Sequence, residues 1–126
     1  NLPTTIGKLD QLASLHLSNN KFSGELPMSL LNCSSLAILD LSHNYFTRYI
    51  QVNFGYSFKN LTILRLQNKY FFGGFPSSFC HLSNLQLLDL SKNHLTGPIP
   101  RCIHKLKGMT SMNNMMQTLI YHIGFL

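Results

Sequence analysis

Residues Leu85–Pro100 read LQLLDLSKNHLTGPIP, and closely similar stretches occur three times earlier in the chain. The four stretches begin at Leu12, Leu36, Leu61 and Leu85, so the unit recurs every 24 or 25 residues. Each has the form LxxLxLxxxxF, with leucine in the last place of the fourth stretch. A fixed spacing of this kind is typical of proteins built from stacked structural repeats.

The leucine spacing predicts a repeat solenoid of mixed α/β class. Apolar and polar residues alternate within LxLxx, as they do in a short strand with one buried face. Strands of successive coils are expected to pair in parallel, about 4.8 Å apart, and to form a concave face. The rest of each unit is expected to return across the convex face in short 3₁₀ or helical turns. No coil buries its own leucines, so neighbouring coils stabilise one another.

The predicted solenoid covers residues 1–108. It consists of a partial repeat, 1–11, followed by repeats that start at residues 12, 36, 61 and 85. Residues 109–126 keep no repeat and are expected to form an irregular tail. The second coil carries Arg48 and Gln51 where the other units have glycine and proline, so we expect it to be the least regular.

The composition argues against several classes of protein. Only 11% of the 126 residues are charged, which is unusual for a cytosolic enzyme and common in secreted glycoproteins. The net charge of +6 comes from scattered basic residues without a nucleic-acid-binding motif, so we expect no nucleic-acid partner. We recognise no signal peptide, and the longest nearly apolar run, 115–126, is shorter than the roughly 20 residues that span a bilayer.

Two stretches, LHLSNNKFSGELP (Leu15–Pro27) and LDLSKNHLTGPIP (Leu88–Pro100), resemble the plant-specific leucine-rich repeat LxxLxxLxLSxNxFSGxIPxxL. A narrower resemblance in FCHLSNLQLLDLSKNHLTGPIPRCIHKLKGMT (Phe79–Thr110) is to receptor-like proteins of the fungal-xylanase-receptor group. Similar coils in that group precede a non-repeat island, which residues 109–126 would then begin. The chain lacks the terminal caps, membrane helix and kinase of such receptors, so we expect a fragment or the product of a truncated gene.

The resemblance implies part of a plant receptor ectodomain on the extracellular side of the plasma membrane. Such an ectodomain binds a peptide, protein or glycan in defence or developmental signalling and hands the signal to a co-receptor kinase. Two alternatives stay open: a secreted inhibitor of the polygalacturonase-inhibiting type, which shares the repeat, and an inactive truncated product. Sequence beyond residue 126 would separate the receptor from the secreted inhibitor.

Catalysis and metal binding are disfavoured. The six histidines fall on different rows of the solenoid, and no Ser–His–Asp or Cys–His set has a workable geometry. Asp40 and Asp89 lie two coils apart with Arg65 between them, which predicts a salt-bridged row rather than a catalytic pair. We therefore expect no enzyme activity, no cofactor and no metal.

The variable positions between the leucines predict the ligand surface. Because side chains alternate along a strand, these residues are expected to point out of the concave face. Arg65, Tyr45 and Tyr70 are expected to contribute most, since arginine and tyrosine dominate measured binding hot spots. The predicted ligand-binding residues are His16, Asp40, His43, Tyr45, Arg65, Asn68, Tyr70, Asp89, Lys92 and His94.

Asn20, Asn44 and Asn93 occupy the place of a structural asparagine ladder, in which side-chain amides bond to the backbone of the turns. In the third coil this place aligns with Lys69, and Asn68 lies one residue early. We therefore expect Lys69 to be a local defect that asparagine would repair.

Two glycosylation sequons and three cysteines complete the candidate sites. The sequons, Asn32-Cys33-Ser34 and Asn60-Leu61-Thr62, both fall outside the predicted strands. Cys80 and Cys102 lie on adjacent coils with an expected Cα separation of roughly 6–7 Å, at the limit for a disulfide. Cys33 fills a leucine position and is expected to remain a buried thiol.

Overall fold

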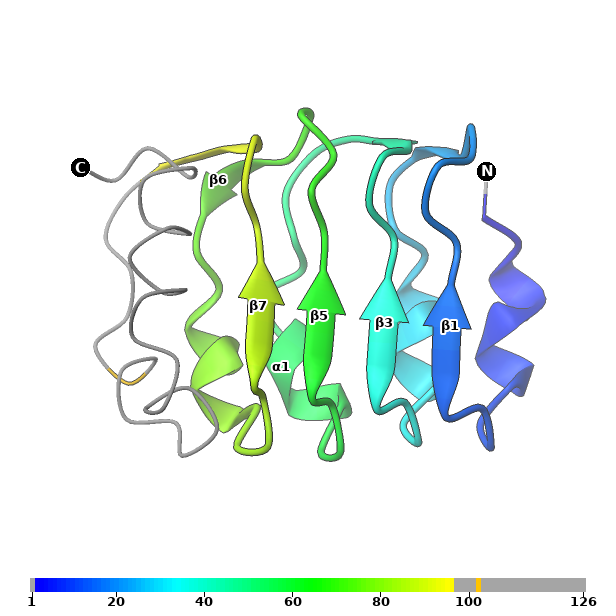
Figure 1. Ribbon diagram of the computed structural model, residues 1–126. Coiled ribbons are helices and arrows are strands. Elements are labelled where there is room, and N and C mark those ends of the chain that lie inside the picture. The colour runs from blue at the N-terminus through cyan, green and yellow to red at the C-terminus, as the bar shows by residue number, and fades with distance from the viewer. Residues whose placement is uncertain (1, 97–101, 103–126) are drawn as a thin grey trace.

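Parallel strands from the four repeats form one continuous sheet. The computed structural model describes residues 2–96 and 102 (Figure 1). We number the coils 1 to 4 from their first residues Leu12, Leu36, Leu61 and Leu85. Each coil contributes one three-residue strand, and the sheet order follows the sequence. The strands are β1 (Ser14–His16), β3 (Ile38–Asp40), β5 (Ile63–Arg65) and β7 (Leu87–Asp89).

The register of this sheet keeps the leucines in line. Leu15 pairs with Leu39, Leu39 with Leu64, and Leu64 with Leu88. Leu39 and Leu64 are fully buried because a coil packs on each side of them, whereas Leu15 in the first coil is only partly buried. The predicted solenoid, with its parallel sheet, is confirmed.

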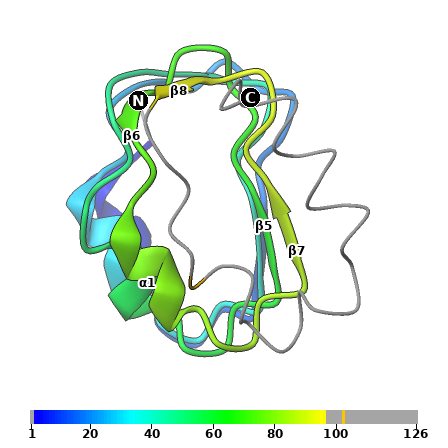
Figure 2. The same ribbon diagram turned by 90° about the vertical axis from the view of Figure 1, so that its left-hand side faces the viewer.

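The helical turns lie on the opposite side of each coil from the sheet (Figure 2). Three are 3₁₀ helices: η1 (Thr4–Lys8), η2 (Met28–Asn32) and η3 (Ser77–His81). Each follows a proline whose φ lies between −64° and −69°, the value that the ring imposes. Coil 2 has Gln51 in place of this proline and forms a short α-helix instead, α1 (Phe54–Ser57).

A second set of short parallel strands was not expected from the sequence. β2 (Ser23–Gly24) pairs with β4 (Tyr45–Phe46), and β6 (Phe72–Gly74) pairs with β8 (His94–Thr96). An isolated bridge from Arg48 to Phe71 links the two pairs. Each coil therefore contributes one strand to the four-stranded sheet, which we call the main sheet. A turn then leads to its second strand, and we call these second strands together the second strip.

One position within the second strip has a left-handed backbone in coils 1 to 3. Gly24 and Gly73 have φ values of 78° and 89°, and Arg48 occupies the same place in coil 2 with a φ of 73°. A non-glycine residue pays roughly 1–2 kcal/mol for this conformation. The Arg48 side chain forms an ion pair with Glu25 at 3.0 Å and lies 5.7 Å from the ring centre of Tyr49. Coil 2 thus keeps the left-handed backbone at this position although arginine replaces the glycine.

Aromatic rings fill the core between the helical turns. Phe54 lies 5.0 Å from Phe58 and 5.8 Å from Phe79, measured between ring centres. All three are fully buried, and burial of such a side chain is worth about 1.5–3 kcal/mol. They tie α1 of coil 2 to η3 of coil 3.

Gly55 allows α1 and η3 to approach this closely. Its amide donates a hydrogen bond to the Ser78 hydroxyl at 2.8 Å. A Cβ atom on Gly55 would lie 2.0 Å from the Ser78 carbonyl oxygen, which belongs to the backbone and cannot rotate away. The two turns therefore pack backbone to backbone at this point.

The structure joins Cys80 and Cys102 in a disulfide, with their Cα atoms 5.4 Å apart. This is the pairing that the sequence favours, at a somewhat shorter separation. Cys33 is a free thiol, buried beside η1, and its Sγ donates to the Ile6 carbonyl at 3.2 Å. Burial, and secondly the negative charge of Asp10, raise the pKa of the Cys33 thiol.

We expect these cysteines to differ sharply in reactivity when the chain is produced through a secretory pathway. Mass spectrometry of unreduced peptides should find Cys80 linked to Cys102. Iodoacetamide at pH 8 should leave Cys33 unmodified in the folded chain and alkylate it in guanidinium, because only the exposed thiolate reacts. An oxidised Cys33 together with a free Cys80 would reverse the assignment.

The predicted boundary at residue 108 and the tail, 109–126, lie outside the described residues and stay predictions. Among the described residues, no helix has the length and apolar character to cross a membrane.

Candidate functional site

The asparagine ladder runs behind the turns that follow the main strands. Asn44 is buried; its Nδ2 donates to the Leu17 and Leu41 carbonyls at 2.9 and 3.1 Å, and its Oδ1 accepts from the Phe22 amide. Asn93 makes the matching bonds to Leu66 and Leu90. Asn20, in coil 1, is exposed and bonds only within its own coil.

The ladder has no defect in coil 3, contrary to the sequence-based expectation. Asn68 itself occupies the ladder and is 2% exposed. Its Oδ1 accepts from the Asn44 amide at 2.9 Å, its Nδ2 donates to the Leu41 and Leu66 carbonyls, and its own amide donates to Asn93. The assignment of Lys69 to the ladder was therefore wrong, and Asn68, predicted to bind ligand, is a buried residue of the ladder.

The backbone accommodates the early asparagine by moving its left-handed residue. In the other coils this residue comes directly before the ladder asparagine: Asn19, His43 and Lys92 have φ values near 60°. In coil 3 it comes directly after, at Lys69, with a φ of 74°. Lysine cannot accept a hydrogen bond and is costly to bury, so coil 3 buries the neighbouring asparagine and exposes Lys69.

The structure divides the other predicted ligand-binding residues between two surfaces. His16, Asp40, Arg65 and Asp89 end the four strands of the main sheet. The rest lie beyond the strand ends, where the chain turns towards the second strip, and not on the strand face as expected. His43 and Lys92 are left-handed turn residues, Tyr45 and His94 begin β4 and β8, and Tyr70 lies in the turn before β6.

The expected salt-bridged row is absent from the described part of the chain. Arg65 is exposed and forms no ion pair with Asp40 or Asp89, although both are its register partners. Each carboxylate instead accepts a hydrogen bond from the amide two residues later, Ser42 or Ser91, at 3.0 Å. The aspartates are therefore turn-stabilising residues, and Arg65 keeps a free guanidinium.

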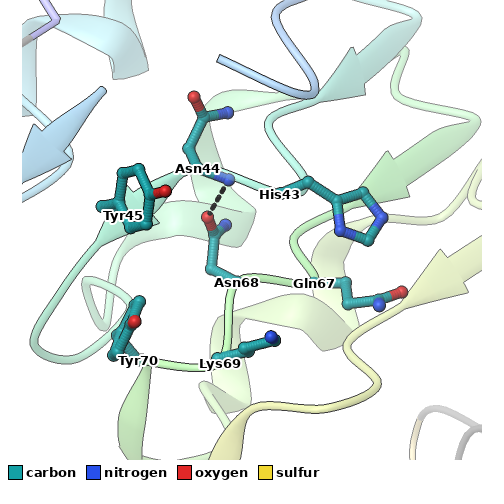
Figure 3. A pocket seen from close by; sticks show the side chains of 7 residues that line it. All are labelled: His43, Asn44, Tyr45, Gln67, Asn68, Lys69 and Tyr70. Carbon is teal, nitrogen blue, oxygen red and sulfur yellow. Dashed lines mark hydrogen bonds between the residues drawn. The ribbon is translucent and has the colours of Figure 1, made fainter. Parts of the chain in front are cut away.

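A pocket lies at the turn edge between coils 2 and 3 (Figure 3). We call it the turn-edge pocket; its volume is about 170 Å³. Tyr45 and Tyr70 lie on one side of the Asn44–Asn68 hydrogen bond, with ring centres 6.3 Å apart, and are 50% and 46% exposed. The residues that line it are His43, Asn44, Tyr45, Gln67, Asn68, Lys69 and Tyr70.

The polar side of the turn-edge pocket is rich in hydrogen-bond donors. His43, Gln67 and Lys69 lie across from the tyrosines (Figure 3). The side-chain amide of Gln67 lies 3.1 Å from the Ser91 hydroxyl, whose hydrogen is donated to the Asp89 carboxylate at 2.6 Å. Lys69 forms no ion pair with a described residue. The pocket thus offers donors and an uncompensated ammonium.

Both sequon asparagines are exposed and lie outside the strands. Asn32 ends η2, and Asn60 lies between α1 and β5. Thr62, the third residue of the second sequon, donates its hydroxyl to the Ala37 carbonyl in the folded chain. Among the described residues, no three His, Cys, Asp or Glu side chains are grouped to hold a metal ion.

The fold and the repeat define a class of protein, and comparison with known sequences agrees. Sequence profiles of the leucine-rich repeat match residues 11–33, 35–56 and 59–113. The chain belongs to the leucine-rich-repeat family.

Within that family the similarity is to plant receptors. Receptor-like protein 16 of Arabidopsis thaliana is 46% identical over 44 residues, which is 34% of this chain and 15% of that protein. The ectodomain of the Arabidopsis receptor kinase SOBIR1 is 36% identical, with a TM-score of 0.78, over 84% of this chain and 56% of its own. The chain therefore spans only part of these relatives.

A third comparison includes bound partners. The Arabidopsis receptor kinase HAESA, solved with the peptide hormone IDA and the co-receptor SERK1, is 37% identical with a TM-score of 0.80. The match covers 85% of this chain and 18% of that one.

Proposed function

We propose that the chain is a peptide-binding segment of a plant cell-surface receptor, located on the extracellular side of the membrane. It acts by binding, and its ligand-bound form presents a surface to a co-receptor kinase, as the HAESA complex includes one. Glycans at Asn32 and Asn60 fit this location, because both side chains are exposed away from the strands.

The observation that carries the proposal is the exposed set of Arg65, Tyr45 and Tyr70 along the main sheet and its turn edge. Arg65 has no ion-pair partner among the described residues, and Tyr45 and Tyr70 are about half exposed although their rings are large. Side chains of these types contribute most to measured binding energies. Four coils in register set them on a rigid scaffold, which lowers the entropic cost of binding an extended peptide.

The full chain can be tested with a phage-displayed library of random dodecapeptides. We expect selection to enrich peptides that bind this surface. Alanine at Arg65, Tyr45 or Tyr70 should each weaken binding by about 1 kcal/mol or more. Ser77→Ala is the control, because Ser77 is exposed on η3, opposite the main sheet. If no peptide is enriched, or if Ser77→Ala weakens binding as much as the other variants, the proposal is wrong.

A further inference from the structure

We propose that the turn-edge pocket binds the carboxylate side chain of an acidic residue in the peptide, with an adjacent ring packed on Tyr45 and Tyr70. The inference rests on the proposed function and adds the chemical class of the ligand residue. It follows from the register of coil 3, from the unused donors of the pocket and from its size.

The register of coil 3 makes this turn unlike the others. Asn68 takes the ladder place one residue early, and Lys69 follows it as the left-handed residue. The left-handed residue of the coil 3 turn is therefore Lys69, which follows its ladder asparagine. In the neighbouring turn of coil 2, the left-handed residue His43 precedes Asn44. The pocket forms between these two unlike turns.

The two asparagine side chains on the floor of the pocket already have hydrogen-bond partners. Asn44 and Asn68 use their side-chain amides in the ladder, so they have little left to offer a ligand. What remains on the polar side is the ammonium of Lys69, which has no ion-pair partner among the described residues, with the imidazole of His43 and the side-chain amide of Gln67 beside it. The ammonium only donates hydrogen bonds, so it matches a group that only accepts them, and an ionised carboxylate is the side chain of that kind.

The nearest acids along the sheet do not compete for this ammonium. The carboxylate of Asp40 is held by the Ser42 amide, and that of Asp89 by the amide and hydroxyl of Ser91. Among the described residues only Arg48 and Glu25 form an ion pair. A carboxylate from a ligand can therefore pair with the Lys69 ammonium without displacing an acid of the described residues. The resulting hydrogen bond is charge-assisted, and such bonds are stronger than neutral ones.

The size of the pocket suits a single side chain of an extended ligand. A volume of about 170 Å³ equals the space of about five or six water molecules at about 30 Å³ each. The tyrosine pair at its border offers ring faces to a neighbouring aromatic or proline ring. An extended peptide with an acidic residue next to a ring fits both walls.

The test measures the binding of two peptides, one acidic and one with the acid replaced by its amide, to the parent chain and to Lys69→Gln. The probe is a synthetic dodecapeptide enriched on the full chain, together with the same peptide carrying Gln for Glu or Asn for Asp. We expect enriched sequences to contain an acidic residue beside a ring. Lys69→Gln should weaken the binding of the acidic peptide about fivefold or more. The amide peptide should bind both proteins equally, since it has no charge for Lys69 to meet.

Lys92→Gln is the matched control. Lys92 is also an exposed, left-handed turn lysine, but it belongs to coil 4 and does not line the pocket. Circular dichroism melts should show that both variants fold like the parent chain. If Lys69→Gln and Lys92→Gln weaken binding equally, the attraction is a general effect of positive charge and the site is refuted.

The outcomes separate this inference from the proposed function. Enriched peptides that lack acidic residues, or that bind Lys69→Gln as well as the parent chain, would refute the carboxylate site and leave peptide binding intact. If no peptide is enriched, peptide binding fails, and the carboxylate site fails with it.

Discussion

Replacing Gly55 with alanine is expected to destabilise the folded chain by about 3 kcal/mol, at the upper end of the usual cost of overpacking. The added Cβ would meet the Ser78 carbonyl oxygen at 2.0 Å and the Phe79 amide nitrogen at 2.7 Å. Since both are backbone atoms, relief requires η3 to move away from α1. That movement would also separate the rings of Phe54 and Phe79 and break the Gly55–Ser78 hydrogen bond. Urea unfolding, followed by circular dichroism, measures the loss.

Gly74→Ala is the matched control for this substitution. A Cβ atom on Gly74 would have no atom within 4 Å, and its φ lies outside the left-handed region. We expect its free energy of unfolding to stay within about 0.5 kcal/mol of the parent value, as for most surface substitutions. Equal stabilities for the two variants would contradict the close packing of α1 on η3.

The second large effect is expected for Asn68→Ala. The substitution leaves the buried Asn44 amide without its acceptor. It also removes one of the two side-chain hydrogen bonds that the Leu41 and Leu66 carbonyls each accept, while the bonds from Asn44 and Asn93 remain. A buried group that loses its hydrogen bond costs about 1–3 kcal/mol, so we expect a loss of about 3 kcal/mol or more. The same denaturant titration measures it.

Lys69→Ala tests the register directly. Lys69 is exposed and has a left-handed backbone, which alanine tolerates no better and no worse. We expect a change within about 0.5 kcal/mol. If Lys69→Ala were the more damaging of the two, the ladder would run through Lys69 and the described register of coil 3 would be incorrect.

The leucine positions were sufficient to predict the sheet. A period of 24 or 25 residues and a two-residue alternation leave little freedom, because a shift by one residue would expose Leu39 or Leu64. The second strip could not be predicted in the same way. Its strands, such as Ser23–Gly24 and Tyr45–Phe46, are short, include glycine and show no alternation. They pair because the stacked coils bring them side by side.

The incorrect assignment of Lys69 to the ladder arose from the alignment of the repeats. Aligning leucines and phenylalanines without a gap puts Lys69 in the ladder place, since Leu66 and Phe71 keep the spacing of Leu41 and Phe46. The alignment treats the backbone as identical in every coil. A single residue can nevertheless exchange its conformation with a neighbour, and the cost of burying a lysine exceeds the cost of moving a left-handed turn by one position.

The sequence predicted several exposed residues of the candidate site but not where the fold places them. The sequence identified Tyr45, Arg65 and Tyr70, and the structure keeps all three exposed. It also suggested a single face, because strand alternation was extended past the strand ends at Asp40 and Arg65. The chain leaves the sheet there, so Tyr45 and Tyr70 belong to the turn edge. Gln67 and Lys69 were missed as pocket residues because their role depends on the shifted register.

The disulfide between Cys80 and Cys102 changes how the chain would carry mechanical force. It closes a loop with a sequence separation of 22 residues, which contains β7 and β8. Tension applied beyond Cys102 would pass through the sulfur atoms into η3, so coil 4 would carry none of it along the covalent path. Reduction of the bond would lengthen the extensible chain by roughly 70–80 Å, at about 3.4 Å per residue. Under load, the redox state of this one bond decides whether coil 3 or coil 4 yields first.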